Sequence, residues 1–189
     1  MEINPTPTLL KYTIFYKISR FRMVFNYLTV LAAIVYATDK LYLPALILVF
    51  TGMIVRTWAA GHIVKRDIIS TGGPYAYTRN PLYAGSFIAG VGTFSLIHNW
   101  WLLLAFLAGF ILFYGCAIRS EEDYLFERHG EAFISYKKIV PVFFPRLKPD
   151  SSLHKSTFAW NIVVSNNEHK SIFWSLVAIA AIFIRAYYF

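Results

Sequence analysis

The sequence has one cysteine and no familiar nucleotide-binding or hydrolase motif. Cys116 is the single cysteine among 189 residues, which excludes an intramolecular disulfide and a cysteine-based zinc cluster. The five histidines show no His-x-x-x-His or similar spacing, so a metal site has no support. A Walker loop, a GxGxxG run and a Gly-x-Ser-x-Gly elbow are also missing, which leaves those sites without a sequence signal.

Charged residues are scarce and unevenly placed. Only 15% of residues are charged and 57% are hydrophobic, whereas a soluble domain carries about a quarter charged residues. The apolar runs approach the ~20 residues that span a bilayer. The sequence therefore predicts an all-α, polytopic helical membrane protein with about five transmembrane helices. We expect these helices at about 23–38, 43–62, 82–96, 101–117 and 171–189.

The basic residues indicate the orientation in the membrane. Fifteen of the eighteen lysines and arginines precede the first apolar run or lie in segments 63–81 and 118–170. By the positive-inside rule, the N-terminus and both segments lie in the cytoplasm, and so does an active site built from them. The net charge of +8 thus reflects topology, and we expect no nucleic-acid partner.

The same pattern divides the chain into four parts, and no cleavable signal peptide is evident before the first run. The basic, aromatic N-terminal segment is either an interfacial helix or a flank of the first span. The expected parts are an interfacial segment 1–22, a membrane core 23–145, a cytoplasmic linker 146–170 and a C-terminal transmembrane helix 171–189.

A polar, kinked segment interrupts the apolar runs with the sequence STGGPYAYTRNPLYAG, residues 70–85. Gly72-Gly73-Pro74 cannot continue a helix, and Pro81 suits the first turn of a new one with Asn80 as its N-cap. Free N–H groups at a helix start can seat a carboxylate or another anion. A plain capped loop with interfacial tyrosines is the alternative.

The fourth apolar run continues into the cytoplasm as one helix that ends at His129-Gly130. This extension brings Glu121-Glu122 to the cytoplasmic edge, close in depth to Arg79, with Arg119 in the same zone. The alternative is a solvated acidic face paired with Arg119 and Arg128, which would contribute little.

Arg56 lies inside the second apolar run, about 13 Å below the membrane edge at helical rise. A charge at that depth must face protein or water, which makes Arg56 a site candidate. Snorkelling toward the headgroups is the competing explanation.

Two stretches together resemble the paired signature of the isoprenylcysteine carboxyl methyltransferase family and its phospholipid methyltransferase relatives. GPYAYTRNPLYAG is similar to Gly-Pro-Tyr-x-Tyr-x-Arg-His/Asn-Pro-x-Tyr-x-Gly. EEDYLFERHGEAFISYKKIVP is similar to a Glu-Glu helix followed by Phe-Gly-x-x-Tyr/Phe-x-x-Tyr and Val-Pro. The similarity covers about residues 55–145, including the upstream RTWA and GHIV.

The resemblance implies an integral-membrane methyltransferase that uses S-adenosylmethionine, needs no metal, and takes a lipidic acceptor from the surrounding membrane lipids. Such a cofactor needs N–H donors, carboxylates and aromatic walls, and the loop and the acidic helix offer all three. The expected cofactor-binding residues are His62, Asp67, Ile68, Ile69, Ser70, Tyr75, Asn80, Pro81, Leu82, Tyr83 and Glu121. The expected catalytic residues are Arg79 or Arg119, to orient a carboxylate acceptor, and Glu122, to take a proton from an amine acceptor.

Three positions depart from the family pattern. Asn80 stands where histidine is more frequent, His129 replaces an aromatic residue, and Ala117 falls where prenylcysteine enzymes have a substrate-contacting arginine.

An isoprenylcysteine-type carboxylate is the favoured acceptor, and a phospholipid amine is the alternative. An NADPH-dependent membrane reductase of the sterol-reductase type and a non-enzymatic membrane protein are the competing classes. Binding of S-adenosylhomocysteine, NADPH or neither separates them.

Overall fold

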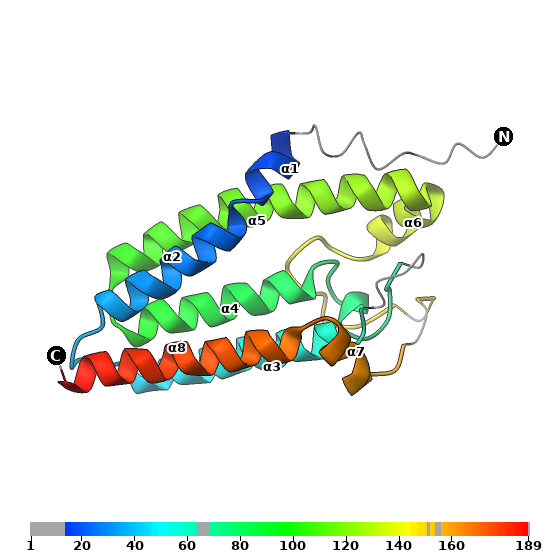
Figure 1. Ribbon diagram of the computed structural model, residues 1–189. Coiled ribbons are helices and arrows are strands. Elements are labelled where there is room, and N and C mark those ends of the chain that lie inside the picture. The colour runs from blue at the N-terminus through cyan, green and yellow to red at the C-terminus, as the bar shows by residue number, and fades with distance from the viewer. Residues whose placement is uncertain (1–13, 64–68, 151, 154–155, 189) are drawn as a thin grey trace.

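The structure, a computed structural model, describes residues 14–63, 69–150, 152–153 and 156–188. This part of the chain is helical and contains no strand. The long helices are roughly aligned, and the short helices α6 and α7 lie at the same end of the bundle (Figure 1). The elements are α1 (Ile14–Ser19), α2 (Arg22–Val35), η2 (Leu43–Ala45), α3 (Leu46–Ala60), η3 (Gly73–Ala76), α4 (Pro81–Leu96), α5 (Trp100–His129), α6 (Glu131–Ile139), α7 (Trp160–Ser165) and α8 (Glu168–Tyr188).

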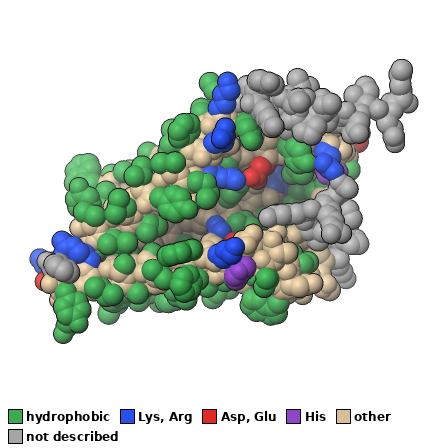
Figure 2. Space-filling view, viewed as in Figure 1, with side chains coloured by type: hydrophobic (Ala, Val, Ile, Leu, Met, Phe, Trp, Pro, Cys, Tyr) green, Lys and Arg blue, Asp and Glu red, His purple; other side chains and the backbone are tan. Residues whose placement is uncertain are grey.

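Four helical stretches in the described residues are long and apolar enough to cross a membrane: Ile14–Val35, Leu43–Ala60, Trp100–His129 and Glu168–Tyr188. Hydrophobic side chains cover much of the visible surface along these helices (Figure 2). These features confirm a polytopic helical membrane protein. Helix α4, where the third of the five spans was expected, has 16 residues and is shorter than those four stretches.

Helix boundaries differ from the expected ones mainly after α6. The extension of α5 as one helix to His129 is confirmed, and Gly130 follows it with a φ of +50°. The expected linker 146–170 contains α7 and the first turn of α8, which begins at Glu168 rather than at Ser171. The expected interfacial segment 1–22 is described only from Ile14, where α1 packs against α5.

Helices α3 and α4 approach each other closely because glycines line their contact. A Cβ atom on Gly52 would lie 2.4 Å from the backbone nitrogen of Ala89, and one on Gly85 would lie 2.8 Å from the carbonyl oxygen of Gly52. Small residues of this kind allow close helix packing in membranes. The contact brings Arg56 on α3 beside Ser86 on α4, where the two side chains form a hydrogen bond.

The apolar core lies toward the end of the bundle opposite α6 and α7. Aromatic side chains of α4 and α5 fill it, and the rings of Phe110 and Tyr114 stack with centroids 4.2 Å apart. Ile182 and Ala186 near the end of α8 join the same cluster. Most of α8 is otherwise only half-buried or exposed.

Candidate active site

A cavity of about 890 Å³ lies between the helices, close to the end of the bundle that holds α6 and α7. Figure 2 shows charged side chains around a hollow in the visible face of the molecule. Six of the helices and the segment before η3 contribute to the wall. The lining residues are Arg22, Met23, Arg56, Ile63, Ile69, Ser70, Tyr75, Arg79, Asn80, Leu82, Tyr83, Glu121, Glu122, Tyr124, Leu125, Arg128, His129, Phe133, Tyr136, Asn166 and Glu168.

The two motif segments are joined by hydrogen bonds that form one wall of the cavity. The backbone N–H of Arg79 donates to the carbonyl of Pro141 over 2.9 Å. The Thr78 hydroxyl donates to the carbonyl of Phe143 over 2.9 Å, and the Tyr136 hydroxyl donates to a carbonyl of η3 over 2.7 Å. The chain after α6 therefore holds the polar loop in place, and loop and chain are parts of one site.

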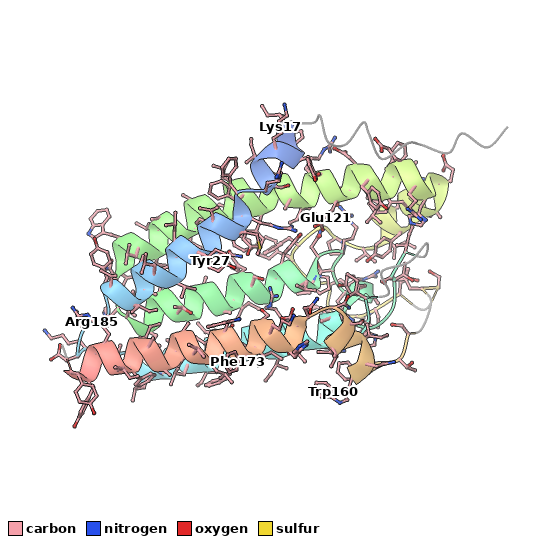
Figure 3. The ribbon with its side chains drawn as sticks, viewed as in Figure 1. Lys17, Tyr27, Glu121, Trp160, Phe173 and Arg185 are labelled. Carbon is pink, nitrogen blue, oxygen red and sulfur yellow. The ribbon has the colours of Figure 1, made fainter. Side chains whose placement is uncertain are left out.

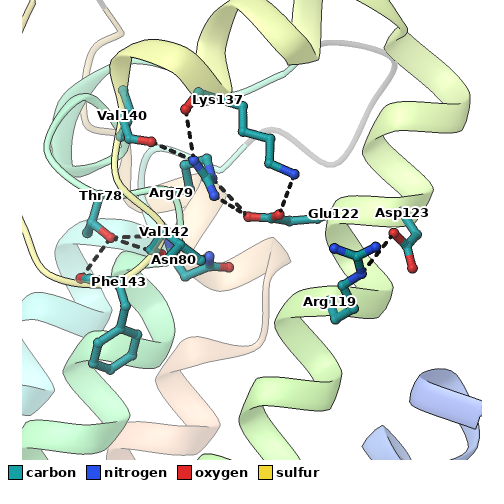
Figure 4. A network of polar contacts seen from close by, with 10 residues as sticks. All are labelled: Thr78, Arg79, Asn80, Arg119, Glu122, Asp123, Lys137, Val140, Val142 and Phe143. Atoms are coloured by element: carbon teal, nitrogen blue, oxygen red, sulfur yellow. Dashed lines mark hydrogen bonds and ion pairs between the residues drawn. The ribbon is translucent and has the colours of Figure 1, made fainter.

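Arg79 and Glu122 form a buried ion pair that links the loop to α5 and α6 (Figure 4). Nε and Nη2 of Arg79 donate to the same Glu122 oxygen over 2.9 and 2.6 Å. The Lys137 ammonium lies 3.1 Å from the other oxygen, and Arg79 Nη1 donates over 2.7 Å to the carbonyl of Val140. The two paired side chains are only 10% and 11% exposed. Both groups are thus occupied by protein partners.

Glu121 belongs to a second polar centre, on the side of α5 that faces α4 (Figure 3). The Tyr83 hydroxyl donates to Glu121 Oε1 and accepts from Arg22. Arg22 Nη1 lies 3.2 Å from the same carboxylate oxygen, and its guanidinium carbon lies 5.5 Å from the centre of the Tyr83 ring. The Glu121 side chain remains half exposed, so its carboxylate can meet a cationic group in the cavity.

A third centre pairs Arg56 of α3 with Glu168 at the start of α8. Nε and Nη2 of Arg56 donate to the two Glu168 oxygens over 2.7 and 2.9 Å, which is the bidentate geometry of a strong ion pair. Arg56 Nη1 also donates to Ser86, and Nη2 donates to Ser171 over 3.3 Å. Glu168 is 6% exposed. Arg56 thus pairs with a protein carboxylate inside the bundle, as expected of a charge that faces protein.

Tyr75 places a buried hydroxyl in the wall between the second and third centres. The residue is 7% exposed, and its hydroxyl has no hydrogen-bond partner among the described residues. Burial raises the pKa of the Tyr75 hydroxyl above its ordinary value, and the neighbouring Tyr136, Glu121 and Glu168 raise it further against the opposing effect of Arg56. The hydroxyl stays protonated at neutral pH. Because an unsatisfied buried hydroxyl is costly, the site suits a ligand with a polar atom at this point.

The structure brings most of the expected site residues to the cavity. Those that line it are Ile69, Ser70, Tyr75, Arg79, Asn80, Leu82, Tyr83, Glu121 and Glu122. Asn80 occupies the N-cap position of α4, but its side chain makes no capping bond and donates instead to the carbonyl of Val142 over 2.9 Å. Asp67 and Ile68 lie outside the described residues.

Three expected residues do not line the cavity. His62 and Pro81 are buried behind its wall, and His62 Nδ1 forms a 2.7 Å hydrogen bond with the Ser156 hydroxyl. Arg119 is 58% exposed and pairs with Asp123 at 3.4 Å (Figure 4). Two residues apart on a helix means about 200° of rotation, so Arg119 points away when Glu121 faces the cavity.

Arg22 and Glu168 line the cavity, although the sequence pattern does not single them out. Arg22 resembles the other basic residues that flank the first span, and an acid in the first turn of a helix is a common feature of helix N-termini. Their partners lie 99 and 112 residues away in the chain. No local signal distinguishes them.

The fold and the site together define an integral membrane protein with a polar, charge-lined cavity between its helices. Residues 41–132 match the family described as phospholipid methyltransferase. This match covers just under half of the chain and confirms the resemblance of the two motifs to that family. The matched segment contains α3, α4 and α5, whereas Arg22 and Glu168 lie outside it.

Several characterised proteins are similar to the chain. The nickel-cobalt-cadmium resistance protein NccN of Alcaligenes xylosoxydans xylosoxydans is 37% identical over 95 residues, which is 49% of this chain and 44% of that protein. Protein-S-isoprenylcysteine O-methyltransferase of Schizosaccharomyces pombe is 37% identical over 81 residues, 43% of this chain and 34% of that protein. The Saccharomyces cerevisiae protein of the same name is 35% identical over 111 residues, 52% and 46% of the two chains. The matches thus span less than half the length of these relatives, and no solved structure matches the chain.

Proposed function

We propose that this protein transfers a methyl group from S-adenosylmethionine to a lipidic acceptor, an isoprenylcysteine-type carboxylate, at the cytoplasmic face of a membrane. The family match and the relatives named protein-S-isoprenylcysteine O-methyltransferase support the reaction class. The observation that carries the proposal is the cavity where the two motif segments meet. A buried Tyr75 hydroxyl lacks a partner there among the described residues, and the Glu121 carboxylate lies in the same wall.

The residues present fit this methyl donor. Glu121 offers a carboxylate to its ammonium or sulfonium charge, Tyr75 offers a hydroxyl, and Tyr83 adds an aromatic wall. When bound, S-adenosylmethionine supplies the methyl carbon and keeps the S–C electron pair as a neutral thioether, so a carboxylate acceptor becomes a neutral ester without proton transfer. The chain's own residues then have to bind the methyl donor and the acceptor, orient them toward each other and exclude water from the cavity.

The state of Glu122 favours a carboxylate acceptor over an amine. An amine acceptor must lose a proton, and Glu122 was the residue expected to take it. Its two carboxylate oxygens are held by Arg79 and Lys137 instead. We therefore assign Arg79 and Glu122 a positioning role, in which they fix the loop against α5 and α6.

The arrangement of α2 and α8 suits an acceptor that arrives from the bilayer. The two helices share the apolar core through Ala33 and Ile182, and they diverge from there toward the cavity (Figure 1). Arg22 and Met23 of α2 and Glu168 of α8 line the cavity at the wide end of the bundle, where α2 and α8 are farther apart. With the basic segments in the cytoplasm, the wide end faces the cytosolic supply of cofactor.

The test is calorimetric titration of detergent-purified protein with S-adenosylhomocysteine, with NADPH as the control ligand. We expect saturable binding of S-adenosylhomocysteine at one site and none of NADPH. Transfer of labelled methyl groups to N-acetyl-S-farnesylcysteine, compared with phosphatidylethanolamine, then identifies the acceptor. Binding of NADPH alone would instead support a reductase, and binding of neither by folded protein would refute the proposal.

A further inference from the structure

The Arg56–Glu168 centre has no part in the function proposed above, yet both side chains line the cavity. A buried pair costs desolvation and is weak evidence of a purely stabilising role. The same cavity is lined by Tyr75, whose hydroxyl has no hydrogen-bond partner among the described residues.

The other arginines near the cavity are less well placed to receive an acceptor carboxylate. Arg128 lines the cavity but is exposed, and its Nη1 donates to the Tyr124 hydroxyl over 2.9 Å. Arg79 donates to Glu122 and to two carbonyls of the chain after α5, and Arg119 lies outside the cavity. Arg22 is engaged with Tyr83 and Glu121 beside the expected cofactor. Arg56 differs from these because its anionic partner is supplied by the terminal helix α8.

Helix α8 is joined to the rest of the bundle near its two ends. Its far end packs in the core through Ile182 and Ala186. Its start is held through Glu168 and Ser171, and through Asn166 just before it, whose side chain donates to two carbonyls at the end of α3 and directly after it. Most of the residues between are half-buried or exposed. Exchange at Arg56 therefore needs only a movement of the Glu168 side chain. The helix also lies outside the family segment 41–132 that supplies the α3–α4 packing.

We propose that Arg56 binds the carboxylate of the acceptor, and that Glu168 is an internal carboxylate which occupies Arg56 until the acceptor replaces it. This inference rests on the proposed function. Exchange of one carboxylate for another keeps Arg56 paired throughout, and the displaced Glu168 carboxylate, which lines the cavity, has to turn toward water there to avoid the large cost of an unpaired buried charge. A methyl ester has no charge, so Glu168 regains Arg56 after the reaction and favours release of the product.

Ligand binding without the cofactor tests the exchange directly. N-acetyl-S-farnesylcysteine and its carboxamide are titrated into wild-type protein, Arg56→Lys and Glu168→Gln. Arg56→Lys keeps the charge but loses the bidentate fork, so affinity for the acid falls about tenfold or more while the amide is unaffected. Glu168→Gln removes the competing anion, so affinity for the acid rises about tenfold with no change for the amide.

Controls separate this effect from damage to the fold. Glu127→Gln removes an exposed carboxylate of α5 that does not line the cavity, and it should leave both affinities unchanged. S-adenosylhomocysteine affinity should stay at the wild-type value in all variants. In kinetics, Arg56→Lys should raise the acceptor KM more than it lowers kcat.

Two results would overturn the inference. One is equal loss of acid and amide binding in Glu168→Gln, which would mean that the Arg56–Glu168 pair only stabilises the fold. The other is unchanged acid affinity in Arg56→Lys. Failure of the proposed function is distinct, because wild-type protein would then neither bind S-adenosylhomocysteine nor methylate the farnesylated acid.

Discussion

Replacement of Glu122 by glutamine tests whether the Arg79–Glu122–Lys137 network holds the site together. The pair is about nine-tenths buried, with side chains 10% and 11% exposed and a shortest contact of 2.6 Å. Removing one partner of a buried pair costs about 3–5 kcal/mol. Glutamine keeps the shape and one carbonyl acceptor, so we expect the lower end, about 3 kcal/mol. For a chain of this length that loss corresponds to a Tm lower by about 6–12 °C.

The assay is thermal unfolding in detergent followed by the intrinsic fluorescence of the five tryptophans. Glu127→Gln is the matched control, since its carboxylate is exposed and its replacement should change stability by no more than about 0.5 kcal/mol. A double variant with Arg79→Gln should lose less than the sum of the single changes, because neither buried charge is then left alone. Equal melting of Glu122→Gln and the control would refute the positioning role. Loss of amine methylation at an unchanged Tm would restore Glu122 as a proton acceptor.

Three further changes probe the cavity and the packing around it. Tyr75→Phe removes an unsatisfied hydroxyl, so Tm should hold or rise while calorimetry shows S-adenosylhomocysteine binding about three- to tenfold weaker; equal affinity would contradict this. Burial lowers the pKa of His62, so the neutral ring is favoured in the fold. The stability that depends on neutral His62 is therefore fully present above the unfolded-state pKa of about 6.5 and is lost as the pH falls below it. In His62→Gln, the Tm should depend less on pH over this range. Gly52→Ala places a Cβ 2.4 Å from the Ala89 nitrogen and should lower Tm by several degrees, whereas Gly115→Ala, with no atom within 4 Å, should not.

The sequence was a good guide wherever the determining interaction is local. The apolar runs predicted the long helices, because transfer of a residue from water to lipid depends mainly on that residue and its near neighbours. The glycine after His129 marked the end of α5 in the same way. The polar loop and the acidic helix were both recognised as parts of one site, and the structure joins them through the chain after α6.

Helical rotation explains the one predicted arginine that the structure leaves outside. Arg119 shares its depth in the membrane with Glu121, but depth does not fix the direction of a side chain around the helix axis. Residues two positions apart differ by about 200°, so both cannot face the same cavity. Arg119 pairs with Asp123 on the exposed side of α5.

A membrane-embedded helical bundle and its two polar motifs can be predicted from the sequence alone. Which charged side chains form pairs is visible only in the folded bundle. Arg22 reaches Glu121 across 99 positions and Arg56 reaches Glu168 across 112. Such pairs depend on how closely the helices approach and how each is rotated, and those quantities follow from glycine contacts and core packing over the whole bundle. The sequence around an arginine or a glutamate does not identify its ion-pair partner, because any opposite charge at the right distance can pair with either one.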